Sequence, residues 1–193
     1  QCCIELISRS CLFLPSTRKV KSMKLKSLIL VALFWASSIF ALDGFYLGGQ
    51  IGHVALTGKT SPTYSNTIGF AVDLGFRANP LLDIMFSSQY SSHTGGPNGL
   101  SVYAETLGAN FHILEANDFD WSLGGGPGFY FFKYAAQTET MFGLNFGTNV
   151  DVKAGDNLKL GLGVRYHLVF RKDSDVGDNL WTIMMRVGYT FGD

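Results

Sequence analysis

Two histidines and two serines near the same predicted strand ends are the residues of this chain whose types could support catalysis. They are His53, His93, Ser91 and Ser92. A serine activated by a histidine is the nucleophile and base of many hydrolases. The spacing argues against this interpretation, because no motif of Ser, His and an acid recurs. In addition, His53 falls on an apolar parity and His93 stands beside glycines in an expected loop. We therefore expect no catalytic residues.

The remaining histidines and the cysteines do not form a metal or redox motif. His112 and His167 are expected at opposite ends of the folded domain, which excludes a shared metal site. Cys2, Cys3 and Cys11 all precede the predicted domain, so we expect neither disulfide nor thiol chemistry within it. No phosphate-binding loop, CxxC pair or EF-hand pattern occurs. These observations favour a protein that is not an enzyme and that needs no cofactor or metal.

The elements that must position the polar side chains are β-strands, because the chain alternates apolar and polar residues over long stretches. In LKLGLGVRYHLVF, residues 158–170, the apolar side chains fall on one parity, and Val169 is the only apolar residue on the other. Seven further segments alternate in the same way, and none has a helical period. The eight predicted strands are residues 45–56, 68–77, 82–90, 101–113, 121–133, 141–153, 158–170 and 180–191.

The composition of the polar parity indicates which face of these strands points inward. It is rich in Gly, Asn, Asp and Arg, whereas the wet face of a soluble β-sandwich is rich in Lys, Glu, Thr and Ser. In a small transmembrane barrel the apolar face meets lipid, and the polar face lines a narrow lumen in which glycine makes room. We therefore predict an all-β fold, an eight-stranded antiparallel up-and-down transmembrane β-barrel, with a ladder defect at Pro127, which cannot donate a backbone hydrogen bond.

Four charged residues are predicted to meet in the lumen at about mid-height: Asp73, Glu105, Arg165 and Arg186. Strict alternation would turn Glu105 toward lipid, so its place in this network requires a β-bulge near Thr106. The balanced charges have two interpretations. They fill the interior as a structural plug, since an eight-stranded barrel is just wide enough for side chains, or they line a gated narrow pore. We favour the plug.

The first part of the chain is typical of an export signal. Residues 23–41, MKLKSLILVALFWASSIFA, place two lysines before an apolar run that ends at a small residue, as in a secretory signal peptide. We expect residues 1–22 to be an over-extended leader and residues 42–193 to be the barrel domain. Six of the 15 basic residues and one of the 15 acidic residues precede Leu42, which leaves nine basic and fourteen acidic residues, a net charge of −5. That balance, without a basic stripe, excludes a nucleic-acid partner.

Aromatic residues of the apolar parity mark two levels along the strands, as in the girdles of membrane barrels. The set expected at the periplasmic ends is Phe45, Phe76, Phe111, Trp121, Tyr189 and Phe191. The set expected at the outer ends is Tyr90, Phe131, Phe142, Phe170 and Trp181. The predicted outer loops are residues 57–67, 91–100, 134–140 and 171–179, and the inner turns are ANP, LEANDFD and AGDN.

The segments GFYLGGQIG, GGGPGFYFF and FGLNFGTNVDVK and the closing RVGYTF resemble the small eight-stranded outer-membrane barrels, the family of the OmpA membrane domain and OmpX. The resemblance implies location in the outer membrane, contact with its lipid, and recognition of the last strand by the barrel-assembly machinery. It departs from the family pattern in that Gly192 and Asp193 follow the final aromatic residue. We expect a monomer with a structural, surface-interaction or minor permeability role. The alternatives are a narrow channel for small solutes or ions and, more distantly, a lipid-modifying enzyme.

Overall fold

The computed structural model describes residues 44–58, 62–96, 98–116, 118–135, 137–170 and 178–192, which all belong to one compact unit. The predicted leader and signal peptide lie outside the described residues. Within the described ranges, no helix has the length and apolar character needed to cross a membrane.

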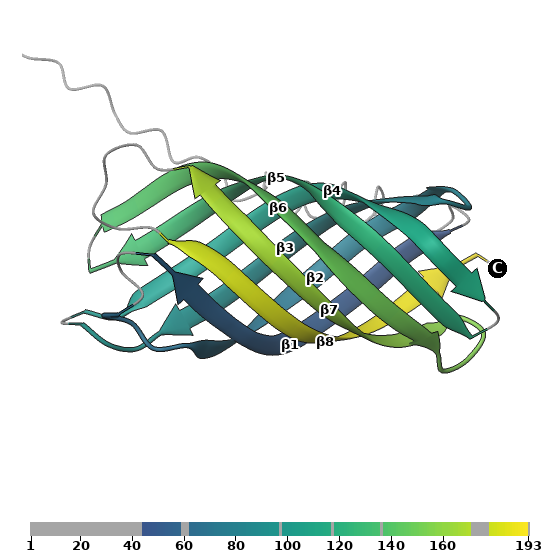
Figure 1. Ribbon diagram of the computed structural model, residues 1–193, viewed down its shortest axis with the longest axis horizontal. Helices are drawn as coiled ribbons and strands as arrows, with labels where there is room; N and C mark the ends of the chain where they lie inside the picture. Colours follow the sequence, from purple (N-terminus) through teal and green to yellow (C-terminus); the bar gives the residue numbers. More distant parts are fainter. Residues whose placement is uncertain are drawn as a thin grey trace, which may run out of the picture. The chain divides into compact units, whose positions relative to one another are not determined.

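Eight antiparallel strands form a single closed barrel in which each strand pairs with its sequence neighbours and β8 pairs with β1 (Figure 1). This is the predicted all-β architecture. The strands are β1 (Phe45–Thr57), β2 (Thr67–Asn79), β3 (Leu82–His93), β4 (Leu100–Ala116), β5 (Phe119–Tyr134), β6 (Gln137–Lys153), β7 (Leu158–Phe170) and β8 (Asn179–Phe191). We call the end at which β1 begins and β8 finishes the terminal end, and the opposite end the loop end.

The alternation seen in the sequence sets the two faces of the wall. In β2, for example, Gly69, Ala71, Asp73 and Gly75 are buried in the lumen and the intervening residues are exposed on the outside. The exposed set is almost wholly apolar, and in the bilayer it meets lipid. Seven of the predicted girdle residues are exposed on the outside. Those near the terminal end are Phe76, Phe111, Trp121 and Tyr189, and those near the loop end are Phe142, Phe170 and Trp181. Tyr90, Phe131 and Phe191 are half-buried and Phe45 is buried.

Three of the predicted connections are too long. The inner turn LEANDFD, residues 114–120, is one of them, because β4 continues to Ala116 and β5 begins at Phe119. Residues 134–140 are not a loop, because β5 continues to Tyr134 and β6 begins at Gln137. Ala135, which follows β5, has φ of 50°. Likewise, β3 continues through His93, so this histidine is a strand residue. These last two extensions add wall at the loop end, where the sequence had been interpreted as outer loop.

The predicted bulge near Thr106 is also wrong. The β3–β4 register runs without a shift from Leu82↔Phe111 to His93↔Leu100, and Ser88 stands opposite Glu105. Glu105 therefore faces outward, as strict alternation requires. The register shift in this strand lies between His112 and Leu114, where it turns both Ile113 and Leu114 to the exposed outer face. The ladder defect predicted at Pro127 is observed, because the β4–β5 pairing passes from Thr106↔Gly128 to Ala109↔Gly125.

Candidate functional site

The lumen is divided along its length, and its half nearest the loop end is filled by apolar side chains. These residues lie on the inward parity of the strands, with Tyr64 added from the connection between β1 and β2. We call this set the apolar plug. Its members are Val54, Leu56, Tyr64, Ala71, Leu100, Val102, Ala104, Tyr130, Phe132, Met141, Val169, Leu180 and Met184. Tyr130, Phe132 and Leu180 are 0% exposed, so solvent does not reach the centre of the plug.

A serine and a histidine from the sequence analysis meet beside the plug. Ser91 Oγ lies 3.1 Å from His93 Nε2, and His93 Nδ1 donates to the carbonyl oxygen of Ser65 at 2.9 Å. The contact resembles a nucleophile and its base. However, Ser91 is 0% exposed and His93 is 1% exposed, and a backbone carbonyl stands where a triad has a carboxylate. The pair is therefore a satisfied interior hydrogen bond, and Ser92 and His53 point outward, away from it.

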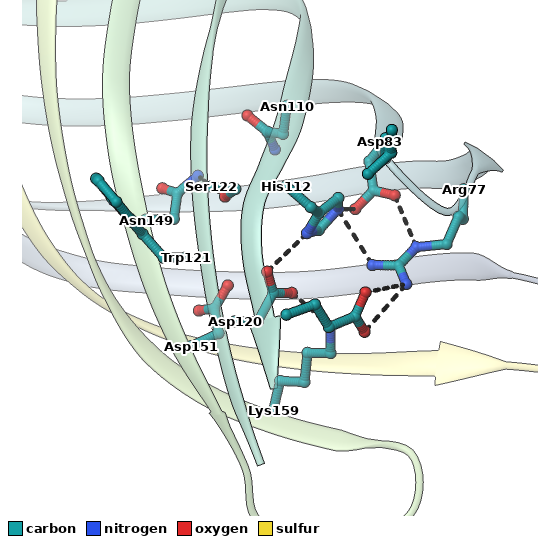
Figure 2. Close-up of polar contacts among 12 residues, drawn as sticks. Arg77, Asp83, Asn110, His112, Asp120, Trp121, Ser122, Asn149, Asp151 and Lys159 are labelled. Carbon is teal, nitrogen blue, oxygen red and sulfur yellow. Dashed lines mark hydrogen bonds and ion pairs between the residues drawn. The ribbon is translucent and has the colours of Figure 1, made fainter. Parts of the chain in front are cut away.

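The half of the lumen nearest the terminal end holds a cluster of alternating charges (Figure 2). His112 Nδ1 lies 2.6 Å from an oxygen of Asp120, and His112 Nε2 lies 2.9 Å from an oxygen of Asp83. Lys159 donates to the other oxygen of Asp120 at 2.9 Å, and Arg77 Nε donates to Asp83 at 3.0 Å. This chain of four contacts joins β2, β3, β4, β5 and β7, so it fastens the wall across the lumen.

The cluster surrounds a cavity of about 240 Å³ at the terminal end. The cavity is lined by Gly44 and Thr190 at the strand ends, by His112 and Asp120 of the cluster, and by Arg186 deeper in the lumen. Glu115 lies at its rim and accepts a hydrogen bond from Arg77 at 3.4 Å. The lumen is thus open to solvent at the terminal end and closed by the plug at the loop end.

Arg186 lies between this cavity and the plug, and two contacts hold it. Its Nη1 donates to Asp151 at 3.2 Å, and its Nη2 donates to the hydroxyl of Tyr46 at 3.4 Å. The Tyr46 ring lies over Gly48 and Gly188, where a Cβ atom would overlap it. Glycine is required at both positions because the ring occupies the space that a side chain would take.

The predicted charge network is only partly assembled in the structure. Asp73, Arg165 and Arg186 face the lumen, and Glu105 does not. The three lumen residues are not ion-paired with one another. Gln50 Nε2 donates to Asp73 Oδ2, and Arg165 Nη1 donates to Asn145 at 3.2 Å. Within the described part of the chain, Asp73 Oδ1 and Arg186 Nε are buried without a hydrogen-bond partner.

The cluster around His112 and Asp120 was not predicted from the sequence. The sequence did contain a signal for it, because charged residues stand at inward-facing positions close to the turns. Arg77 and Asp83 flank the turn between β2 and β3, and Lys159 follows the turn between β6 and β7. In the described ranges, no group of three or more His, Cys, Asp and Glu side chains has the arrangement of a metal site. His112 and His167 lie in different halves of the lumen, with His167 Nδ1 beside the Tyr130 hydroxyl of the plug at 3.0 Å.

The sequence matches no protein-family model and no curated protein. Solved structures with the same fold do match. Neisserial surface protein A superposes with a TM-score of 0.69 at 15% identity, over 77% of this chain and 98% of that chain. OprG of Pseudomonas aeruginosa superposes with a TM-score of 0.57 at 13% identity, over 78% of this chain and 97% of that chain. The N-terminal β-barrel domain of OprF from the same organism superposes with a TM-score of 0.52 at 12% identity, over 77% of this chain and 98% of that chain.

These matches and the closed topology define the class of protein. The chain has the fold of the small eight-stranded outer-membrane β-barrels, as the sequence resemblance implied. Its apolar outer wall is the surface that such a barrel presents to lipid. The protein is located in the cell outer membrane.

Proposed function

We propose that the protein is a closed, non-catalytic barrel that holds its loop-end connections at the cell surface. The signal peptide expected from residues 23–41 and the short turns at the terminal end favour the periplasm for that end. A surface role also agrees with the name of one similar protein, Neisserial surface protein A. The Ser91 and His93 pair does not favour catalysis, because both side chains are buried.

The single observation that carries this proposal is the apolar plug. An ion that crossed the lumen would have to lose its water among Tyr130, Phe132 and Leu180, which have no exposed surface. Moving an unpaired ion into an apolar environment costs far more than thermal energy supplies. Side chains in a close-packed interior also leave few voids larger than a water molecule. We therefore expect the barrel to be electrically silent.

Recording in planar bilayers tests the closed lumen. The wild-type protein is compared with a Tyr130→Ala, Phe132→Ala double variant, which removes two aromatic rings from the plug. The matched control is Phe129→Ala, Phe131→Ala, which removes two rings from the outer face of the same strand. Each protein is first shown to be folded by a shift in gel mobility on boiling. We expect the wild type and the control to be silent and the plug variant to conduct. Steady conductance by folded wild type would overturn the proposal.

A narrow channel is the second candidate function, and the solvent-accessible cavity at the terminal end favours it. In that case the plug side chains would have to move to open a path to the loop end. The wild type would then conduct, and Arg186→Ala would change its ion selectivity, because the charged guanidinium of Arg186 lines the cavity.

A further inference from the structure

His53 on β1, Ser88 on β3 and Glu105 on β4 are polar side chains of the outer wall between the two aromatic girdles, and each faces outward by strict alternation. Thr148 on β6 also faces outward there, but Trp121 and the carbonyl oxygen of Ser122 satisfy its hydroxyl. An ionisable side chain at this position is costly in lipid and marks a candidate functional site. None of the three is needed to fill the lumen, so an external partner is the remaining role.

Glu105 is only half satisfied by its own barrel. Ser88 Oγ donates to Glu105 Oε1 at 2.8 Å. Oε2 has no hydrogen-bond partner among the described residues. Aromatic residues neighbour Glu105 on the outer wall. Tyr103 occupies the next outward position on β4, with its ring centroid 4.7 Å from that of Tyr90 and tilted by 46°, and Phe129 stands opposite Glu105 on β5. Glu105 therefore presents one free acceptor from within an aromatic frame.

His53 is a donor at the same level of the wall. It is exposed and stands between Ile68 and Ile183, and it makes no hydrogen bond within the described part of the chain. The next outward position of β1 toward the loop end, Ala55, stands opposite the girdle residue Trp181. On β1, His53 is therefore the outward-facing residue next below the loop-end girdle. On β4, Glu105 is likewise the outward-facing residue next below Tyr103. A ring N–H of histidine donates to a carboxylate in either protonation state.

An apolar depression lies below His53, and two exposed apolar side chains lie below Glu105. The depression is lined by Ile51, Met185 and Val187 around Gly49, and it continues over Val150, Val152, Leu160 and Leu162 of β6 and β7. A Cβ atom at Gly49 would be in van der Waals contact with Val187, at 3.9 Å. On the other face, Phe86 and Leu107 stand opposite one another and are 41% and 55% exposed. One face therefore offers a depression and a donor, and the other offers two exposed apolar side chains and an acceptor.

We propose that a second copy of this chain docks in the membrane, with the β3–β4 face of one barrel against the β1–β8 face of the next. His53 of one copy donates to Glu105 Oε2 of the other, and Phe86 and Leu107 enter the depression at Gly49. The contact is heterologous, so it generates rings or rows of barrels. The low dielectric of the bilayer strengthens the hydrogen bond. This association replaces the monomer expected from the sequence, and it requires an outer wall in lipid but not a closed lumen.

Cysteine crosslinking tests the contact directly. In a full chain with Cys2, Cys3 and Cys11 replaced by serine, one protein carries His53→Cys and another carries Glu105→Cys, and the two are mixed in phospholipid vesicles and oxidised. The matched control replaces His53→Cys with Leu144→Cys. Leu144 is also one outward step below a loop-end girdle residue, Phe142, but on β6. We expect the His53 and Glu105 pair to crosslink several-fold more than the control, because Phe86 and Leu107 in the depression at Gly49 still hold the two positions together after the substitutions remove the hydrogen bond itself. Equal yields would overturn the proposal.

An exchange of the two side chains distinguishes this contact from random collision. Sedimentation in detergent is compared for wild type, His53→Glu, Glu105→His and the double exchange. Each single exchange places like groups opposite each other and should lower association about tenfold, and the double exchange should restore it. A wild type that sediments as a monomer at all concentrations, or a double exchange that restores nothing, would refute the contact. Neither result depends on whether the lumen conducts, so the proposed closed barrel stands or falls separately.

Discussion

Asp120 is the residue of the charge cluster whose removal should cost most. Its carboxylate lies between His112 at 2.6 Å and Lys159 at 2.9 Å, and its side chain is 4% exposed. The Asp120→Ala substitution leaves His112, which is 5% exposed, without the acceptor for Nδ1. Because three strands meet at this carboxylate, its loss also removes a cross-link between β4, β5 and β7.

The expected magnitude follows from the burial of the two partners. Removing one member of a buried ion pair costs about 3–5 kcal/mol, because the remaining charge is left uncompensated. The Lys159 side chain is 19% exposed and borders the cavity, so its ammonium group can regain water after the substitution. We therefore expect Asp120→Ala to lower the free energy of unfolding by about 2–4 kcal/mol.

The measurement is equilibrium unfolding in urea of protein folded into phospholipid vesicles, followed by tryptophan fluorescence. The control is Glu115→Ala, at the rim of the same cluster. Glu115 contacts Arg77 at 3.4 Å and its side chain is 34% exposed, so this pair is worth no more than about 1 kcal/mol. Adding Lys159→Ala to Asp120→Ala should lower the free energy of unfolding by less than Lys159→Ala does in the wild type, because the ion pair is already broken. Equal losses for Asp120→Ala and Glu115→Ala would refute the reasoning that burial sets the cost.

Two further predictions concern the wall. Leu162→Arg places a charge on the lipid face at mid-strand and should lower the free energy of unfolding by about 2–4 kcal/mol, whereas Asn98→Arg in a loop should leave the same urea midpoint unchanged. Equal tolerance of both would contradict the assigned outer face. Gly188→Ala puts a methyl group into the Tyr46 ring and should cost about 1–3 kcal/mol in the same assay. Combining it with Tyr46→Ala should recover part of that loss, and an unchanged loss would show that the ring is not the obstacle.

The alternation of the strands made most of the fold predictable. A period of two assigns each residue to one face, and the Gly, Asn and Asp residues on the inward parity distinguish a narrow lumen from a wet surface. Glu105 was misplaced because a carboxylate in lipid was judged too costly, and a bulge was introduced to avoid it. The consecutive apolar residues Ile113 and Leu114 are the sequence signal for the actual register shift, since both must leave the polar lumen.

The partners within the lumen could not be predicted in the same way. Asp151 on β6 meets Arg186 on β8, and Asp120 on β5 meets Lys159 on β7, across a strand that lies between them. Such contacts depend on strand tilt and on the stagger of the register around the barrel, which the alternation of a single strand does not contain. The apolar plug was missed because inward residues were assumed to be polar throughout. Val169, the one exception noted in its strand, belongs to the plug.

The position of the plug has a consequence for how the protein tolerates change. The seal is made almost wholly by strand residues such as Val102, Phe132 and Leu180. Exposed connection residues such as Asn98 can therefore change while the seal stays in place, whereas Gly95 cannot, because it pairs with Tyr64 of the plug. With the loop end at the cell surface, as proposed, residues of this kind could be exchanged without opening a path through the outer membrane.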